Sequence, residues 1–269
     1  MTAPQAKRHH YVPRFHLDRF AKNGAVHVRR RDGRTFTSGT VNVAVECGFY
    51  DVHLADGTVS SAVEDMFSVV EGEAAVALSN IDQTLAAPPP GSEDRSALSL
   101  HLALQMARTP EQRERVLFPE RLAEFLNGRE LTLELVAEFL RDVHLGFPPA
   151  PHEVQGAFDF AAVALGGSSA ITPEMSMAIT LSSVEETMPA LEAMHWCVEH
   201  DRKGRLITSD TPMVLWRTPT PRDAYEGFGV NTAAEIRFPL DPTKQLVLTP
   251  RPGFWRTYCT ADWRAESAA

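Results

Sequence analysis

The order of strand-like and helix-like patterns along the chain constrains its fold more than any other feature. Residues 1–60 alternate apolar residues with turn pairs, residues 61–192 carry apolar residues at helical spacing, and residues 193–250 return to short apolar runs. Strands at both ends, without alternation of strand and helix, argue against a doubly wound sheet. We therefore expect one α+β domain over residues 1–269, with a mixed or antiparallel sheet built from N- and C-terminal strands and a helical middle section.

Local patterns predict the individual elements. The stretch GAVHVRRRDGRTFTSG at 24–39 predicts a hairpin that turns at 32–33. Alternating valines at 41–45 predict another strand, followed by a second turn at 56–57. Five C-terminal strands are expected in HWCVEH, RLITSD, MVLW, EIRFPL and QLVLTP. Apolar residues three and four apart predict helices over 61–81, 97–109, 111–127, 131–146, 152–165 and 173–192.

The composition indicates a folded protein of a reducing compartment. The 43% hydrophobic content is sufficient for a core. Cys47, Cys197 and Cys259 are far apart, so they predict neither a disulfide framework nor a cysteine zinc site. No run approaches the roughly 20 apolar residues of a membrane helix, and the first residues lack a secretory apolar region. We expect a cytoplasmic protein with no membrane partner.

The charge is distributed unevenly, although the whole chain carries −9. Residues 1–34 hold nine Lys or Arg against two Asp, a net charge of +7, so the other 235 residues carry −16. A basic head can attract phosphates, or it can dock on the acidic body of its own chain. On the first interpretation, nucleic acid or a nucleotide is the partner, and the substrate-binding candidates are Arg14, Arg29, Arg30 and Arg31.

The stretch KRHHYVPRFHLDRF at 7–20 contains an adjacent pair, His9 and His10. In an extended segment neighbouring side chains point to opposite faces, so one histidine can enter a site while the other supports it. Imidazole suits general-base chemistry near neutral pH and metal binding. The alternative is that both histidines are packed beside Tyr11 and Pro13.

A polar stripe crosses the apolar helix expected at 97–109, because His101, Gln105 and Arg108 are spaced at i, i+4 and i+7. A helix that is apolar on nearly every side is buried, and a buried arginine needs an acidic or a phosphate partner. Arg108 therefore predicts either a structural salt bridge or an anion site, with Gln105 as a further substrate contact.

Two further sets of carboxylates are candidates for chemistry. Asp210 lies in TSD, where a predicted strand breaks into a turn, and such positions present reactive groups. Its other role would be to accept hydrogen bonds from local backbone N–H groups. Glu64 and Glu71 share a face of the first long helix, as a solvated edge or as metal ligands. The candidate ligands of a divalent metal ion are His10, Glu64 and Asp210.

Five ordered blocks, HHYVPRFHLDRF, VNVAVECGFYDV, LALQMARTPEQR, ITSDTPM and FPLDP, resemble domain-of-unknown-function family 4238 over nearly the whole chain. That resemblance implies no established activity. HHYVPR also looks like the His-His-x-x-Pro opening of HNH-type nucleases, although Asn23 and His27 are too closely spaced for the rest of that motif. The P-loop, GxGxxG, HExxH and GxSxG motifs are absent from the sequence.

Two functions follow as hypotheses. The first is a metal-assisted hydrolase of phosphodiester or nucleotide substrates, with His9, His10, Arg108 and Asp210 as its catalytic residues. The second is a non-catalytic binding or regulatory module, which could bind nucleic acid through the basic head. In that module the HHYVP and TSDTP blocks are folding determinants that join the two ends of one sheet.

Overall fold

The computed structural model describes residues 8–50, 52–53, 59–60, 62–143, 148–166, 173–217 and 229–250. Its helices are α1 (Arg14–Asp18), α2 (Ala62–Thr84), α3 (Glu93–Ala107), α4 (Pro110–Leu126), α5 (Leu133–Val143), α6 (Pro151–Leu165) and α7 (Pro173–Ala193), with 3₁₀ turns η1 (Thr40–Asn42) and η3 (Val230–Thr232). Its strands are β1 (Arg8–His10), β2 (Ala25–Arg29), β3 (Thr35–Gly39), β4 (Val45–Cys47), β5 (Val52–His53), β6 (Val59–Ser60), β7 (His195–His200), β8 (Val214–Trp216), β9 (Glu235–Asp241) and β10 (Lys244–Thr249). The α+β class is confirmed.

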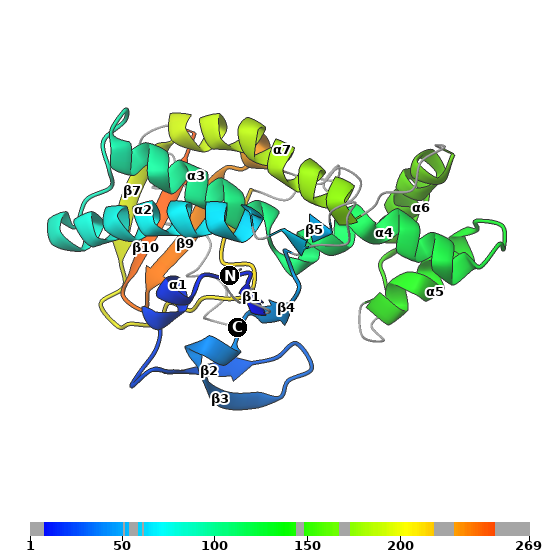
Figure 1. Ribbon diagram of the computed structural model, residues 1–269, viewed down its shortest axis with the longest axis horizontal. Helices are drawn as coiled ribbons and strands as arrows, with labels where there is room; N and C mark the ends of the chain where they lie inside the picture. The colour runs from blue at the N-terminus through cyan, green and yellow to red at the C-terminus, as the bar shows by residue number, and fades with distance from the viewer. Residues whose placement is uncertain are drawn as a thin grey trace, which may run out of the picture.

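The body of the molecule is a sheet with helices packed on one face. The C-terminal strands form an antiparallel sheet in the order β7-β10-β9-β8, and α2, α3 and α7 lie against it (Figure 1). Apolar residues of β9 and β10, including Phe238, Leu246 and Leu248, are buried together with Leu78 and Leu102 from the helices. This two-layer core is the surface on which the N-terminal segment docks.

The N-terminal strands do not extend that sheet. Within the described residues they form separate two-stranded antiparallel sheets, β1 with β4, β2 with β3, and β5 with β6. The two ends of the chain meet through side chains instead. Arg19, just after α1, donates from Nε to the Leu240 carbonyl at 2.7 Å and forms a bidentate pair with Asp82. The fold class was therefore predictable, but a sheet shared between the two ends was not formed.

Two expected strands are absent from the described residues. Residues 40–42 form η1, and Ala44 has a φ of 50°, so the alternation of valines over 41–45 is broken and only β4 remains as a strand. Residues 205–207 form no strand. Among the described residues their backbone makes a single backbone–backbone hydrogen bond outside helices and strands, from the Leu206 N–H to the Pro242 carbonyl. β5 and β6 pair as a hairpin, while the turn expected at 56–57 lies outside the described residues.

All six predicted helices are present, and their ends follow capping chemistry. α3 begins before residue 97 because Ser92 accepts a hydrogen bond from the Arg95 N–H at 3.2 Å and caps the helix. Thr109 caps α4 in the same way, with Pro110 in the first turn. α4 ends at Asn127, which has a left-handed φ of 46°.

Helices α4, α5 and α6 form an arm that projects from the body (Figure 1). The arm has a separate apolar cluster, made by Leu122, Leu126, Val136, Leu140 and Ala161 with aromatic residues around them. None of the helices that the structure describes is long and apolar enough to cross a membrane.

Candidate functional site

The histidine pair lies on β1, between β4 and the helices of the body. In the antiparallel register His9 faces Glu46 and His10 faces Val45 on β4. Because side chains alternate along a strand, the two imidazoles take opposite faces. The side chain of His9 is only 3% exposed, whereas His10 is half-buried. The expectation that the two histidines point in different directions is confirmed.

His9 is held by partners at both ring nitrogens. The backbone N–H of Tyr50 donates to His9 Nδ1 at 3.0 Å, and His9 Nε2 lies 3.1 Å from a carboxylate oxygen of Glu64. Its ring also stacks on that of Tyr50, with centroids 5.4 Å apart. Since Nδ1 accepts, Nε2 carries the proton and donates to Glu64. His9 therefore orients β1 and has no ring nitrogen left for a substrate.

His10 has one committed nitrogen and one that is free among the described residues. Its Nε2 lies 3.3 Å from the carbonyl oxygen of Thr40, which can only accept, so Nε2 carries the proton and Nδ1 is an acceptor. Burial lowers the pKa of His10 below 6.5, with Arg8 and Arg14 contributing, while the Thr40 hydrogen bond and Glu71 oppose the shift. His10 is therefore neutral at pH 7, with a lone pair available for a proton.

Arg108 is buried, and each of its three guanidinium nitrogens has a hydrogen-bond partner. Its side chain is 2% exposed, and Nη1 donates to Glu71 at 2.7 Å. Nε and Nη2 donate to the Gln105 side-chain oxygen at 3.2 and 3.0 Å, and the guanidinium lies over the Phe67 ring. Gln105 in turn donates to the Tyr11 carbonyl at 2.9 Å. Of the two partners expected for Arg108, the structure contains the acidic one, and the polar stripe of α3 holds the N-terminal segment.

Glu64 and Glu71 share one face of α2, as expected, and each holds a basic group. Glu64 pairs with His9, and Glu71 pairs with Arg108, while both side chains remain more than a quarter exposed. Among the described residues, no three His, Cys, Asp or Glu side chains are placed to hold a metal ion. The expected ligand set of His10, Glu64 and Asp210 does not form such a group.

Asp210 and Arg14 remain at the surface. The Ser209 hydroxyl accepts from the Thr211 N–H, so Ser209 holds the turn and Asp210 is exposed without a hydrogen bond in the described chain. The charge of Asp210 reaches Tyr11: burial raises the pKa of the Tyr11 phenol first, and Asp210 raises it further. Arg14 is 62% exposed and lies 3.6 Å from a carboxylate oxygen of Asp18.

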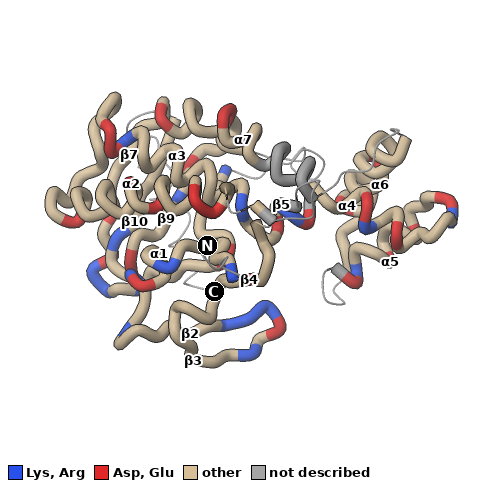
Figure 2. Tube along the Cα trace, in the orientation of Figure 1, with Lys and Arg blue, Asp and Glu red and all other residues tan. Residues whose placement is uncertain are grey.

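The remaining substrate-binding candidates lie in the turn of the β2–β3 hairpin. The predicted register is confirmed, with Arg29 opposite Thr35. Arg29, Arg30 and Arg31 are exposed, and Figure 2 shows them as a basic stretch at the end of the hairpin. Within the described part of the chain they pair with no carboxylate.

The predicted residues thus separate into two groups. The inward group is His9, Glu64, Gln105 and Arg108, whose polar atoms pair with one another and with Tyr50, Tyr11 and Glu71. The outward group is His10, Arg14, Arg29, Arg30, Arg31 and Asp210, which solvent can reach. Of the inward group, only Glu64 keeps a substantial exposed fraction, whereas His9, Gln105 and Arg108 are buried.

Two further buried histidines are His101, which the sequence placed in the polar stripe of α3, and His16, which sequence reasoning did not single out. His16 is fully buried, stacks on Phe238 and contacts the Thr208 hydroxyl through Nε2 at 3.2 Å. Burial lowers the pKa of His16 to about 3, and burial also lowers that of His101 well below 6.5. In the described structure His16 Nδ1 and His101 Nε2 have no hydrogen-bond partner. The sequence signal for His16 was its place in the stretch KRHHYVPRFHLDRF, which also contains the histidine pair.

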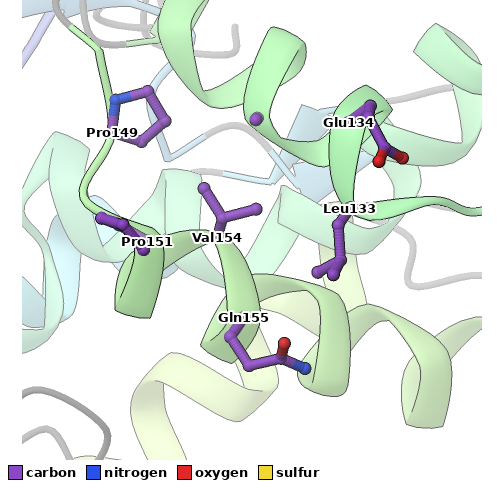
Figure 3. A pocket seen from close by; sticks show the side chains of 7 residues that line it. Leu133, Glu134, Pro149, Pro151, Val154 and Gln155 are labelled. Atoms are coloured by element: carbon purple, nitrogen blue, oxygen red, sulfur yellow. The ribbon is translucent and has the colours of Figure 1, made fainter.

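The arm contains a pocket whose lining differs from the polar surroundings of the histidines. It lies between α5 and α6 and is largely apolar (Figure 3), with a lining of Leu133, Glu134, Ala137, Pro149, Pro151, Val154 and Gln155. None of the predicted site residues lines it, so we assign no catalytic role to this pocket.

Comparison with known proteins adds a family and no activity. The model of the family described as "Protein of unknown function (DUF4238)" matches residues 8–259. No curated protein and no solved structure matches the chain. The match begins at β1 and includes every residue of the inward and outward groups.

Proposed function

The chain belongs to the DUF4238 family, and we propose that its outward group hydrolyses phosphodiester or nucleotide substrates, with His10 as the general base. The observation that carries this proposal is the state of His10. Its Nε2 proton is fixed on the Thr40 carbonyl, and its Nδ1 lone pair is free among the described residues. A neutral, oriented imidazole with one open nitrogen is the requirement for removing a proton from an attacking water.

The exposed charges of the outward group suit an anionic substrate. Arg14 and the hairpin arginines supply exposed positive charge, and a phosphodiester carries one negative charge per phosphate. In this proposal Nδ1 of His10 accepts the proton of a water, whose oxygen attacks phosphorus as the bond to the leaving oxygen breaks. The leaving oxygen takes a proton from solvent. His9 and Arg108 act only by fixing β1 and the segment that follows it.

The described residues of the outward group offer a divalent metal ion one unpaired carboxylate and no group of three ligands. Asp210 is the carboxylate that is free to bind it, because Glu64 is paired with His9. Asp210 would hold a bound ion such as Mg²⁺, which would supply positive charge at the phosphate.

The test is hydrolysis of bis(p-nitrophenyl) phosphate and of nucleotides by the pure protein, with and without Mg²⁺ or Mn²⁺. We expect His10→Gln to lower the rate by roughly 100-fold or more, as the loss of a general base does. The wild-type rate should decrease in acid with a midpoint below pH 6.5, because the pKa of His10 is lowered and protonation removes its lone pair. Equal rates in the wild type and His10→Gln would refute the proposal.

A second candidate function is a non-catalytic binding or regulatory module, and the inward group favours it. His9 and Arg108 are satisfied by Glu64, Gln105 and Glu71 without a substrate. The contact between His16 and Thr208 also ties the HHYVPRFH block to the TSDTP block. On this account both blocks serve folding, as the second sequence hypothesis stated.

The two candidates differ in what His10→Gln and Asp210→Asn change. A binding module predicts no hydrolysis by any form of the protein, together with a lowered melting temperature in both variants. The hydrolase predicts a lost rate at an unchanged melting temperature. A measurable wild-type rate that disappears in stable variants decides against the module.

A further inference from the structure

The β2–β3 hairpin is an isolated ribbon with unusual exposure. Every residue from 29 to 37 is exposed, and within the described residues β2 and β3 pair only with each other. A two-stranded hairpin is marginal in water unless another surface covers it. Figure 1 shows the ribbon extending from the body, next to β1 and β4. The hairpin therefore presents its side chains outward and does not build the core.

The hairpin carries unpaired positive charge. Arg34 is paired with Asp32, with Nε 2.7 Å from a carboxylate oxygen. Arg29, Arg30 and Arg31 have no such partner among the described residues, so the ribbon presents three free guanidinium groups in succession. This matters because the rest of the chain is strongly acidic. The acidic body has not neutralised these arginines, which was the alternative for the basic head.

An aromatic ring accompanies these charges. Phe36 is 42% exposed and lies opposite Val28, so its ring projects from the face of the ribbon opposite to that of Arg29 and Thr35. An exposed ring on the same narrow ribbon as the arginines suits the stacking of an unpaired base, since every base has a flat face and each nucleotide brings a phosphate. A base pair in a duplex has no free face to offer.

The charged turn acts electrostatically on the segment that follows β1. The positive charge of Arg30 acts on the Tyr11 phenol, where it opposes Asp210 and Glu46. Tyr11 follows His10 directly in the chain.

We propose that the β2–β3 hairpin binds single-stranded nucleic acid, with Arg29, Arg30 and Arg31 on the phosphates and Phe36 stacked on a base. This inference rests on the proposed function for its chemistry, because it identifies the phosphodiester substrate as a polymer. The binding itself does not depend on hydrolysis and is measured separately.

The experiment uses a fluorescent single-stranded oligodeoxynucleotide of about 12 nucleotides and the same sequence as a duplex. Binding is measured with EDTA over a range of salt concentrations. We compare Arg29→Gln/Arg30→Gln/Arg31→Gln with a control of equal charge change, Arg141→Gln/Arg202→Gln/Lys203→Gln. The control residues are exposed and lie on α5 and in the turn after β7.

We expect the hairpin variant to lose most of its affinity and to flatten the salt dependence by about two units of slope, as the loss of three phosphate contacts to a single strand does. The control should keep both. Phe36→Ser should weaken single-strand binding about tenfold and leave duplex binding unchanged. Equal losses in hairpin and control variants, equal affinity for the duplex, or full competition by poly-glutamate would overturn the inference.

The outcome separates this inference from the proposed function. Hydrolysis of bis(p-nitrophenyl) phosphate without any oligonucleotide binding leaves the His10 proposal intact and rejects the hairpin proposal. Oligonucleotide binding through the hairpin without hydrolysis of either substrate rejects His10 as a base and keeps the binding surface.

Discussion

The body and the arm of this molecule both have apolar cores, but in the body buried polar pairs also fix the N-terminal segment. In the arm, the contacts between α4, α5 and α6 are made by apolar and aromatic side chains around Leu122. In the body, the N-terminal segment is fixed by a buried guanidinium, a buried imidazole and two carboxylates of α2. Apolar contacts tolerate several arrangements of similar volume, whereas a buried charge tolerates only the arrangement that pairs it. The buried polar pairs of the body therefore specify where β1, with His10 on it, lies.

The largest expected effect is in the body. Arg108→Met leaves the Glu71 carboxylate and the Gln105 side-chain oxygen without their arginine partner, and breaking one side of a buried pair costs up to about 3–5 kcal/mol of unfolding free energy. Urea denaturation measures this loss. Arg141→Met, an exposed arginine of α5, is the control and should change little. A loss below about 1 kcal/mol for Arg108→Met would mean that the pair contributes no more than a surface pair.

A core truncation in the arm should be slightly smaller and local. Leu122→Ala leaves a cavity among α4, α5 and α6, at a cost of about 2–4 kcal/mol. Hydrogen exchange should show faster exchange in those helices while α2 and α3 stay protected. Uniform loss of protection in both regions would contradict the separation of the two cores.

Acid should weaken the body before the arm. His16 is neutral in the folded state with a pKa of about 3, and its unfolded value is near 6.5, so unfolding takes up a proton below pH 6.5. Stability is therefore full above pH 6.5 and falls as the pH drops, by about 2 kcal/mol between pH 6.5 and 5 for this histidine. Urea midpoints across that range measure it, and His16→Leu should reduce the slope.

The smallest expected effect is at the surface of the arm. Arg121 pairs with Glu114 on α4, and both side chains are at least 40% exposed. Exposed pairs contribute about 1 kcal/mol or less, because water screens them. Arg121→Ala should shift the urea midpoint only slightly, and 1 M salt should abolish even that shift. A loss as large as that of Arg108→Met would remove the contrast between the two regions.

Sequence patterns predicted what depends on local periodicity. The six long helices and the first hairpin follow from apolar spacing and from the Asp32–Gly33 turn, and these elements are confirmed. The sheet that we expected the two chain ends to share is not formed within the described residues, because strand pairing is non-local and periodicity does not determine it. The strand predicted from the valines at 41–45 was also wrong, because the left-handed Ala44 interrupts the extended backbone there.

The site was partly predictable for the same reason. Helical spacing placed Gln105 and Arg108 on one stripe and Glu64 with Glu71 on one face of α2. The distribution of partners, His9 to Glu64 and Arg108 to Glu71, depends on how three separate segments meet. No local pattern contains that information, and the same holds for the contact between His16 and Thr208.

The most direct test of this account is to measure two quantities, melting temperature and phosphodiester hydrolysis, for His9→Ala and His10→Ala. The account predicts that His9→Ala lowers the melting temperature by several degrees, because it leaves the Tyr50 N–H and Glu64 without a partner. It predicts that His10→Ala abolishes hydrolysis and melts like the wild type. A stable His9→Ala protein, or a His10→Ala protein that unfolds early or remains active, would contradict the division of the histidine pair into an inward and an outward residue.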